Sequence, residues 1–413
     1  KGNKMKIVQI NAVYARLSTG RTTREMHEYF LSHGIESYVA APDLADLKDN
    51  CFKIGGSLDH KIHALHSRIT GKQAYASHVP TNKLINWMDN IHPDIVILRN
   101  LHGNYINHPS LSKHLADRNI PTIAVLHDSW LLTGGCTYYI TPKCNRWKSK
   151  CGQCPVYHHD MTSWFFDRTS EVLEERKRYL GSIPRLSLIG VSQWVANDAK
   201  LSVLGSSAYR VQCIYNWIDL KLFHPQEKSV LKIKKGFDKE SFIVLGVSTS
   251  WVPVKGIKVF HELADILPTN IKIVLIGNSD SIKEKHPNII YMPRTANLKQ
   301  LAEMYAMADD FVNPTVQDAC GKTTAEALSC GIPVVAYNGT ATPELVGLDG
   351  SCGYLIDNLD AQEYATKIIE IQKNKHIAYT DNCRRRAESM FDMETNIQQY
   401  IRLIKDMISN QSL

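Results

Sequence analysis

The chain has 413 residues, of which 44% are hydrophobic and 22% are charged, as in ordinary folded globular proteins. No run approaches the roughly 20 uninterrupted apolar residues that a transmembrane helix needs, which argues against a membrane-spanning protein. The net charge of +7 comes without a basic tail or a nucleic-acid motif, so phosphates or acidic lipid headgroups are better candidate partners than nucleic acid.

Short apolar runs alternate with longer amphipathic runs along the first half of the chain. The predicted strands are Lys6–Ile10, Ser37–Ala40, Ile95–Leu98, Thr122–Leu126, Leu186–Val191 and Val211–Ile214. The predicted helices are Thr22–Ser32, Asn82–Asn90, Ser110–Arg118, Glu171–Leu180 and Gln193–Leu204. Apolar strands separated by helices are typical of a parallel sheet that is covered on both faces.

The alternation restarts after a linker-like stretch at residues 225–238. The predicted strands are Phe242–Val247, Ile271–Ile276, Ile289–Tyr291, Asp310–Asn313, Pro333–Ala336 and Gly353–Ile356. The predicted helices are Ile257–Leu267, Leu298–Met307, Thr323–Cys330 and Ala361–Lys373. The predicted fold class is therefore α/β, with two doubly wound, Rossmann-like parallel-sheet domains, residues 1–215 and 216–391, facing each other across a cleft.

The segment Thr395–Ser409 is predicted to form an amphipathic helix. It is either the last helix of the second domain or a helix that crosses back onto the first. In the second case residues 392–413 would complete the first domain.

The most informative stretch, Asn313–Glu344, reads NPTVQDACGKTTAEALSCGIPVVAYNGTATPE. A strand ends at its start, and a loop carrying Asp318 and Gly321 leads into a helix. Because it has no side chain, Gly321 would let the backbone approach a ligand closely. The N–H groups at the positive end of this helix would form a diphosphate site, and they belong to Lys322, Thr323 and Thr324.

Two carboxylates flank this predicted diphosphate site. Asp318 precedes the helix and Glu326 lies within it, eight residues further on. Carboxylates repel phosphate but accept hydrogen bonds from sugar hydroxyls, so Asp318 could reach a hexose and Glu326 a ribose. The alternative is an Asp that caps the helix and a Glu on its solvated face.

A lysine follows the first strand of the second domain. Residues 246–256 read GVSTSWVPVKG and place Lys255 in the loop before the next helix, where its charge could meet the donor phosphates. The site would then lie at the carboxyl ends of the parallel strands, where open α/β sheets bind ligands. Taken alone, Lys255 could equally be a surface lysine.

The second half resembles the family-4 retaining glycosyltransferases of the GT-B fold. The family signature is a Glu, seven residues and a second Glu, and here Asp318 and Glu326 have that spacing. Ser250 stands where the family tends to have an Arg, five residues before Lys255. The resemblance spans essentially the whole chain and includes a further set of matching positions: Gly331, Pro333, Val334, Val335, Gly339, Glu344, and the hinge-like Asn216–Asp219 with Phe223 and Pro225.

The resemblance implies a reaction and roles for these residues. A glycosyl group would move from a nucleoside diphosphate sugar to a hydroxyl with retention, and the charge that develops on the diphosphate would be neutralised by Lys255 and the helix terminus. The resemblance also favours the last helix crossing back onto the first domain. Further expected donor contacts are Gly20, Ser250 and Arg294. Since no Asp-x-Asp pair is present, no catalytic metal or other cofactor is expected.

The first domain offers matching candidates. Ser18–Arg21 is expected in a loop before the first helix, against the donor phosphate, and the lone Gly20 argues against a dinucleotide-binding fingerprint. His127, at a strand end, matches the family histidine near the donor sugar, although a lone histidine is often structural. The expected acceptor-side residues are His102, Asn104, Tyr105, Asp128 and Trp130.

These motifs of the first domain resemble a branch that builds bacterial capsule or exopolysaccharide units, as colanic-acid-type transferases do. The implied partners are a UDP- or GDP-sugar and a saccharide or polyprenyl-linked saccharide acceptor. The implied location is the cytoplasm, at the inner face of the plasma membrane. A nucleotide-sugar epimerase of the same fold and a non-catalytic nucleotide-sugar binding module remain as alternatives.

Four of the ten cysteines cluster in one short stretch. Cys151 and Cys154 form a C-x-x-C knuckle, and Cys136 and Cys144 precede it. A structural zinc site is the first interpretation, because such a polar loop needs a cross-link to keep one shape. Free thiols with redox chemistry and two disulfides are the alternatives.

The segment His60–Lys72 reads HKIHALHSRITGK. As a helix it places Ile62, Leu65 and Ile69 on one side with basic residues beside them, a pattern that fits an anionic membrane surface. The alternative is an ordinary half-buried helix.

Overall fold

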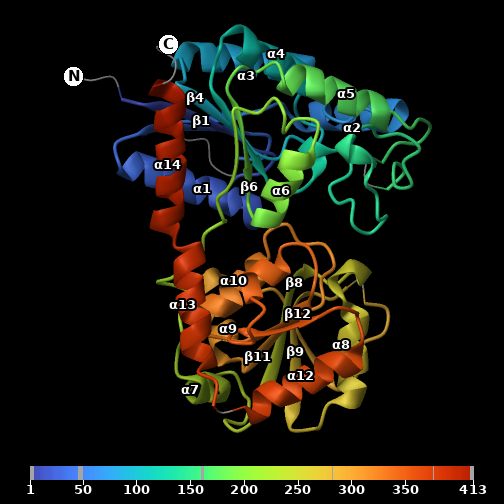
Figure 1. Ribbon diagram of the computed structural model, residues 1–413, viewed down its shortest axis with the longest axis vertical. Coiled ribbons are helices and arrows are strands. Elements are labelled where there is room, and N and C mark those ends of the chain that lie inside the picture. Colours follow the sequence, from blue (N-terminus) through green and yellow to red (C-terminus); the bar gives the residue numbers. More distant parts are fainter. Residues whose placement is uncertain (1–3, 45–49, 160–161, 281, 375, 410–413) are drawn as a thin grey trace. The chain divides into compact units, whose positions relative to one another are not determined.

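The computed structural model describes residues 4–44, 50–159, 162–280, 282–374 and 376–409 (Figure 1). Its contacts divide the chain into two compact domains. The first comprises residues 1–214 and 397–413, and the second comprises residues 215–396. The chain therefore leaves the first domain once and returns to it. Residues 410–413, which belong to the predicted returning segment, lie outside the described residues.

The first domain contains a seven-stranded parallel sheet. Its strands are β1 (Lys6–Ile10), β2 (Glu36–Ala41), β3 (Cys51–Lys53), β4 (Ile95–Leu98), β5 (Thr122–Leu126), β6 (Leu186–Gly190) and β7 (Arg210–Cys213). Their order is β3-β2-β1-β4-β5-β6-β7, and every pair is parallel. The central strands are almost fully buried, which explains their continuous apolar sequences.

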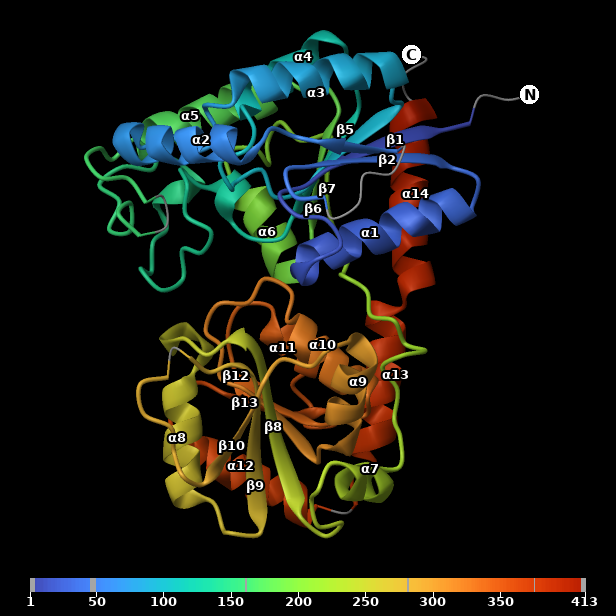
Figure 2. The ribbon, with the colours of Figure 1, turned by 180° about the vertical axis from the view of Figure 1, so that it is seen from behind.

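Helices lie on both sides of this sheet (Figures 1 and 2). They are α1 (Leu17–Ser32), α2 (Ser57–Thr70), α3 (His78–Ile91), α4 (His108–Asp117), α5 (Thr169–Leu180) and α6 (Gln193–Leu201), with the short 3₁₀ turns η1 (Trp130–Leu132) and η2 (Arg146–Lys148). The last helix, α14 (Met393–Ser409), returns to this domain. Its Gln398 donates a hydrogen bond to the Tyr29 hydroxyl at 2.9 Å, and Tyr400, Ile404 and Met407 are buried.

The second domain contains a six-stranded parallel sheet. Its strands are β8 (Phe242–Ser250), β9 (Ile271–Asn278), β10 (Ile289–Met292), β11 (Asp310–Asn313), β12 (Val334–Tyr337) and β13 (Gly353–Ile356), in the order β10-β9-β8-β11-β12-β13. Its helices are α7 (Lys228–Lys234), α8 (Ile257–Ile266), α9 (Leu298–Met307), α10 (Lys322–Ser329), α11 (Thr342–Val346), α12 (Ala361–Lys373) and α13 (Tyr379–Phe391), with the turn η3 (Pro253–Lys255).

Two apolar layers cover the faces of the second sheet. Along β8, Ile243 and Leu245 belong to one layer, with side chains of α9, α10 and α13, whereas Val244 belongs to the other, with side chains of α8 and α12. This alternation follows from the two-residue period of a strand. Both domains are therefore doubly wound parallel sheets, as predicted for the fold class.

Two local predictions were wrong. The stretch at residues 225–238 is more than a linker, because it contains α7. Gly20 lies in the first turns of α1 and not in a loop before it. The preceding loop folds back onto the helix, with Ala15 N–H donating to Gly20 O at 2.9 Å, and a Cβ on Gly20 would lie 3.2 Å from backbone atoms of this loop. A helix start is possible here because Gly20 leaves room for that loop.

None of the helices in the described parts of the chain is long and apolar enough to cross a membrane.

Candidate active site

The second sheet has a switch point between β8 and β11. The chain continues from β8 to β9 and β10 on one side and from β11 to β12 and β13 on the other. The loops that leave neighbouring strands at such a point diverge and leave room for a ligand at the carboxyl edge. The predicted donor residues lie in these two loops and at the start of α10.

The loop from β8 to α8 approaches the end of β11 very closely. Gly256 has φ of 73°, and a Cβ on it would lie 2.4 Å from Cγ of Pro314. Only glycine fits both the left-handed backbone and this contact. Lys255 precedes it at the end of η3, and within the described part of the chain its ammonium group has no hydrogen-bond or ion-pair partner. The loop therefore presents an unneutralised cation at the switch point.

Asp318 organises the loop from β11 to α10. Its Oδ1 accepts hydrogen bonds from the backbone N–H of Gly321 at 2.7 Å and of Cys320 at 3.2 Å. Gly321 has φ of 62°, and a Cβ on it would lie 2.7 Å from a methyl group of Leu345. The carboxylate thus fixes the turn just before the helix, which is close to the capping role considered as an alternative for this residue.

The first turn of α10 is oriented toward this carboxyl edge. The first bond within the helix runs from Ala325 N–H to Gly321 O at 2.9 Å, so the N–H groups of residues 322–324 have no acceptor inside the helix. Thr324 is buried, and its hydroxyl accepts a hydrogen bond from Asn313 Nδ2 at 3.0 Å. That bond ties the helix start to the end of β11. The helix terminus is suited to bind an anion.

Glu326 lies inside the domain and not on a solvated face. Its side chain is 4% exposed, and its Oε2 accepts a 3.2 Å hydrogen bond from the hydroxyl of the buried Tyr305 on α9. A buried carboxylate is costly unless it is hydrogen-bonded. The position therefore needs partners, and this excludes the solvated-face alternative.

A third loop, from β12 to α11, completes the edge. Ala341 N–H donates to Asp318 O at 3.3 Å, and Thr340 Oγ1 accepts from Asp318 N–H at 3.4 Å. Glu344 of α11 accepts a 2.6 Å hydrogen bond from the Tyr215 hydroxyl. These contacts hold the Asp318 loop from the side opposite to β8.

The remaining donor candidates of this domain are less central. Ser250 is the last residue of β8, where its carbonyl accepts a hydrogen bond from Ser248 Oγ. Arg294 is exposed in the segment between β10 and α9. Since β10 is two strands from β8 and strands are about 4.8 Å apart, Arg294 starts roughly 10 Å from the switch point and reaches it only along the length of its side chain.

The first domain has its own switch point, between β1 and β4. Arg99, directly after β4, is 1% exposed, and its guanidinium donates to Nε2 of His127 at 3.1 Å. It also donates to Oε1 of Gln9 at 3.3 Å, and burial lowers the pKa of Arg99 to about 10. Because a guanidinium cannot accept, His127 must be the acceptor at Nε2, which makes it a neutral imidazole with its proton on Nδ1.

The predicted acceptor-side residues divide into two groups. His102 and Asp128 are partly exposed and form a pair, with 2.9 Å between Nε2 and Oδ2. Together with the residues around Arg99 and His127 they line a small cavity at the ends of β4 and β5. Trp130 also lines this cavity, and Asn104 is partly exposed as well.

The other three acceptor-side candidates make contacts inside the first domain. Tyr105 is fully buried, with its hydroxyl bonded to Asn100 O at 2.7 Å. Trp130 is 1% exposed and lies under the Arg176 guanidinium, 3.6 Å from the ring centroid. Asn104 accepts a 2.9 Å hydrogen bond from Ser67 of α2. The structure thus gives these residues supporting contacts within the domain.

The described residues give no support to the zinc site that the cysteine spacing suggested, and that site stays a prediction. The four cysteines form no disulfide, and among the described residues no group of three or more His, Cys, Asp or Glu side chains is arranged to hold a metal ion. Burial raises the pKa of the Cys151 thiol to about 11. The loop is held in other ways: Tyr139 donates to Asp198 of α6 at 2.7 Å, and its ring packs on Trp147 at 4.8 Å.

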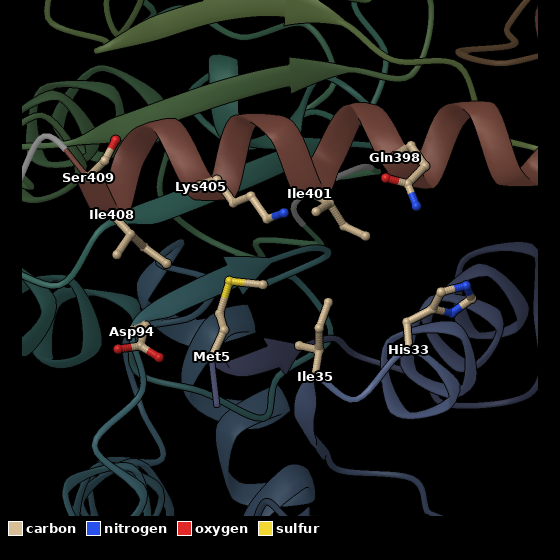
Figure 3. A pocket seen from close by; sticks show the side chains of 9 residues that line it. All are labelled: Met5, His33, Ile35, Asp94, Gln398, Ile401, Lys405, Ile408 and Ser409. Atoms are coloured by element: carbon tan, nitrogen blue, oxygen red, sulfur yellow. The ribbon is translucent and has the colours of Figure 1, made fainter. Parts of the chain in front are cut away.

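A larger cavity lies elsewhere in the first domain. It has a volume of about 600 Å³ and lies between α14 and the amino ends of β1, β2 and β4 (Figure 3). Met5, Ile35 and Asp94 line it from the sheet side, and Ile401 and Lys405 line it from α14. Because ligands of open α/β sheets bind at the carboxyl edge, this cavity is not the candidate site.

Three contributing residues could not be singled out from the sequence. Arg99 follows a predicted strand directly, and Asn313 ends one, so their positions at strand ends were the available signal. Tyr305 gave no such signal, because it lies 21 residues before Glu326 in a helix that looks like ordinary core.

Several solved structures share the arrangement of two doubly wound domains. Sucrose-phosphate synthase from Thermosynechococcus elongatus has a TM-score of 0.72 and 15% identity, over 98% of this chain and 100% of that one. Anabaena Alr3699/HepE, solved in complex with UDP and glucose, has a TM-score of 0.65 and 18% identity, over 97% of this chain and 100% of that one. The chain therefore has the GT-B fold.

The sequence comparisons find similarity mainly in the second domain. Residues 241–374 match the family described as "Glycosyl transferases group 1". MMP alpha-(1->4)-mannosyltransferase from Mycolicibacterium hassiacum is 24% identical over 57% of this chain and 57% of its own length. N-acetyl-alpha-D-glucosaminyl L-malate synthase from Bacillus anthracis is 23% identical over 48% of this chain and 54% of its own length. The chain thus spans about half the length of the curated relatives it matches.

Proposed function

We propose that this chain is a glycosyltransferase that transfers a glycosyl group from a nucleoside diphosphate sugar to a hydroxyl of a saccharide acceptor. The observation that carries the proposal is the meeting of the Lys255 loop, the Asp318 loop and the start of α10 at the β8/β11 switch point. A lysine and a helix N-terminus suit a diphosphate, and the two carboxylates beside them suit hydroxyls.

Each group has a defined task in this proposal. The Lys255 ammonium and the N–H groups of residues 322–324 stabilise the negative charge that develops on the diphosphate as the glycosyl bond breaks. Glu326, oriented by Tyr305, accepts from the ribose hydroxyls. Oδ1 of Asp318 accepts hydrogen bonds from the backbone of its own turn, so Oδ2 would be the atom that contacts the donor sugar.

His127 would act on the sugar from the first domain. The family resemblance implies that the ring contacts a donor-sugar hydroxyl, and Arg99 holds the ring through Nε2. The role of Arg99 is to hold the ring and its tautomer, and burial of the guanidinium makes that orientation rigid.

The finer parts of the proposal come from the family resemblance. They are retention at the anomeric carbon, a UDP- or GDP-sugar donor, a polyprenyl-linked saccharide acceptor, and a role in surface polysaccharide synthesis at the cytoplasmic face of the membrane. UDP and glucose bound to Anabaena Alr3699/HepE support a nucleotide-sugar donor. The mannosyltransferase named above supports a saccharide acceptor.

A panel of radiolabelled UDP- and GDP-sugars, with and without a polyprenyl-linked saccharide, tests the proposal. We expect one donor to be consumed and its label to appear in the lipid phase only when acceptor is present. Conversion of the donor without acceptor would indicate an epimerase instead, and binding without conversion of any donor would indicate a binding module. NMR of the product reports whether the anomeric configuration is retained.

A further inference from the structure

Helix α2 presents its apolar stripe outward. Leu58 is 71% exposed, Ile62 58%, Leu65 48% and Ile69 41%, whereas the buried members of this helix are the polar His63 and Ser67. The four apolar residues are spaced by four, three and four positions, so they form one line along the helix. A surface helix of a globular domain normally has the opposite arrangement.

The orientation of α2 is fixed by hydrogen bonds from its buried side. His63 Nδ1 lies 2.7 Å from Ser77 Oγ, and Ser67 Oγ donates to Asn104 Oδ1 at 2.9 Å. Burial lowers the pKa of His63 to about 4, so this histidine stays neutral inside the domain. A rotation of α2 that buried the apolar stripe would break these two bonds.

An aromatic loop continues the stripe. Trp164, Phe165 and Phe166 are 52%, 64% and 48% exposed. The loop is attached to the end of α2, since Trp164 N–H donates to Arg68 O at 2.7 Å and a Cβ on Gly71 would lie 2.6 Å from Phe166 O. The seven exposed side chains, Leu58, Ile62, Leu65, Ile69, Trp164, Phe165 and Phe166, are called the α2 surface below.

Cations border the α2 surface. Lys61 and Arg68 are exposed on the same helix, and the Arg68 guanidinium lies 5.9 Å from the centre of the Trp164 ring. The Arg168 guanidinium lies 5.3 Å from the centre of the Phe166 ring. The nearby carboxylate of Glu171 pairs with Lys72 and Arg168, and that of Glu175 pairs with Lys72 and Arg178, so these cations outnumber the carboxylates. The border is therefore positive beside the apolar stripe.

We propose that the α2 surface binds the interface of an anionic lipid bilayer. A continuous line of aliphatic side chains, a tryptophan and two phenylalanines with arginine and lysine beside them suits the boundary between headgroups and acyl chains. The cations beside the α2 surface favour an anionic bilayer over a groove on another protein. In a bilayer interface these cations stay hydrated among the headgroups while the apolar side chains are buried. The inference deepens the proposed function and rests on it, because a polyprenyl-linked acceptor would be met at such a bilayer.

Co-sedimentation of the full chain with vesicles tests this binding. We expect the protein to pellet with vesicles that contain phosphatidylglycerol and much less with pure phosphatidylcholine vesicles. The double variant Leu65→Ser/Ile69→Ser and the single variant Phe165→Ser should each weaken partitioning by about tenfold or more. Lys61→Glu/Arg68→Glu should remove the preference for anionic lipid.

Two matched controls are available in the second domain. Ile233 on α7 is 62% exposed, so Ile233→Ser removes a comparable apolar group away from the α2 surface. Lys221 and Lys239 are also exposed, so Lys221→Glu/Lys239→Glu makes the same charge change elsewhere. Both controls should pellet like the unaltered protein.

Three results would overturn the inference. They are failure of the unaltered chain to bind anionic vesicles, equal binding by the Leu65→Ser/Ile69→Ser variant, and sedimentation-velocity data in which that variant turns a dimer into a monomer while vesicle binding persists. Binding of UDP and GDP is measured on the same samples. If the unaltered chain binds nucleotide but not anionic vesicles, the membrane inference alone is refuted. If it binds the vesicles but no nucleotide, the proposed function alone is refuted.

Discussion

The hydroxyl of Tyr305 on α9 donates a hydrogen bond to Oε2 of Glu326 on α10, and both side chains are buried. The carboxylate proposed to hold the ribose is therefore set in place by a helix that contributes nothing else to the site. Positioning of this kind can be measured separately from direct binding.

Glu326→Ala should reduce nucleotide affinity by about tenfold or more, because a charge-assisted hydrogen-bond pair is worth roughly 1.5–3 kcal/mol. Isothermal titration calorimetry with UDP and GDP measures this. Glu326→Gln, which keeps the shape but not the charge, should fall in between. An unchanged affinity in Glu326→Ala would remove this residue from the donor site.

Tyr305→Phe should lower nucleotide affinity less than Glu326→Ala does, and should also lower the free energy of unfolding by about 1 kcal/mol, because Glu326 loses a buried partner. The matched control is Tyr364→Phe. Tyr364 is fully buried in the same domain, and among the described residues its hydroxyl has no hydrogen-bond partner. The control should leave affinity unchanged, and equal losses in both variants would contradict a specific role for Tyr305.

Gly256→Ala should displace the Lys255 loop, because the new methyl group would lie 2.4 Å from Pro314 Cγ. Gly236 also has a positive φ, of 83°, but no atom lies within 4 Å of the position of its Cβ. Gly236→Ala should therefore cost only about 1 kcal/mol for the left-handed backbone, whereas Gly256→Ala should cost about 2–4 kcal/mol and weaken nucleotide binding. Nucleotide affinity from calorimetry and stability from thermal unfolding are compared for the two variants. A larger loss in Gly256→Ala than in Gly236→Ala indicates a steric effect, and equal losses indicate an effect of backbone conformation alone.

His127→Gln should lower the rate of sugar transfer by about tenfold or more while the affinity for UDP or GDP stays nearly constant, because the lost contact is made to the sugar and not to the nucleotide. Initial rates at saturating donor measure it once a donor is known. His224→Gln, at an exposed position, serves as the control. Full activity of His127→Gln would show that the ring is only a partner for Arg99.

The buried carboxyl group of Asp198 predicts a dependence of stability on pH. Burial raises the pKa of Asp198 to about 6, although the Tyr139 hydroxyl opposes the shift. Because the folded-state pKa lies above that of an unfolded Asp, about 3.9, the group stabilises the fold fully below about pH 4, and this contribution disappears as the pH rises through about 6. Asp198→Asn should remove that part of the pH dependence and keep an acceptor for Tyr139.

Urea unfolding between about pH 4 and pH 8, followed by tryptophan fluorescence, tests the Asp198 prediction. The exposed Glu174→Gln is a suitable control in the same domain. A pH profile that is the same for Asp198→Asn and the unaltered protein would contradict it.

The sheets were predictable because buried parallel strands carry continuous apolar sequences. β1, β4, β5, β11 and β13 have the predicted bounds. α13 was not predicted, although Tyr379, Cys383, Ala387 and Phe391 form a buried line with a spacing of four, because charged residues fill the space between them. α7 has only seven residues and too few positions to show a period.

The candidate site was predictable in its residues but not in their partners. The spacing of Asp318 and Glu326 located the donor loop, yet it could not show that one carboxylate bonds its own turn while the other is buried beside Tyr305. The amphipathic pattern of α2 was also visible in the sequence. Which face points outward depends on the contacts of His63 and Ser67 with the start of α3 and the loop after β4, and such long-range contacts have no local signature.

The return of the chain to the first domain has a consequence for synthesis. Residues 215–396 can complete their own core as soon as they have left the ribosome, but the first domain lacks the buried Tyr400, Ile404 and Met407 until residues 397–409 have followed. The domain whose translation starts first is thus the one that closes last. Until then the apolar face that α14 covers is exposed, and chaperones or other nascent chains can bind it. The face is buried only when the last turns of α14 have been translated and have packed against it.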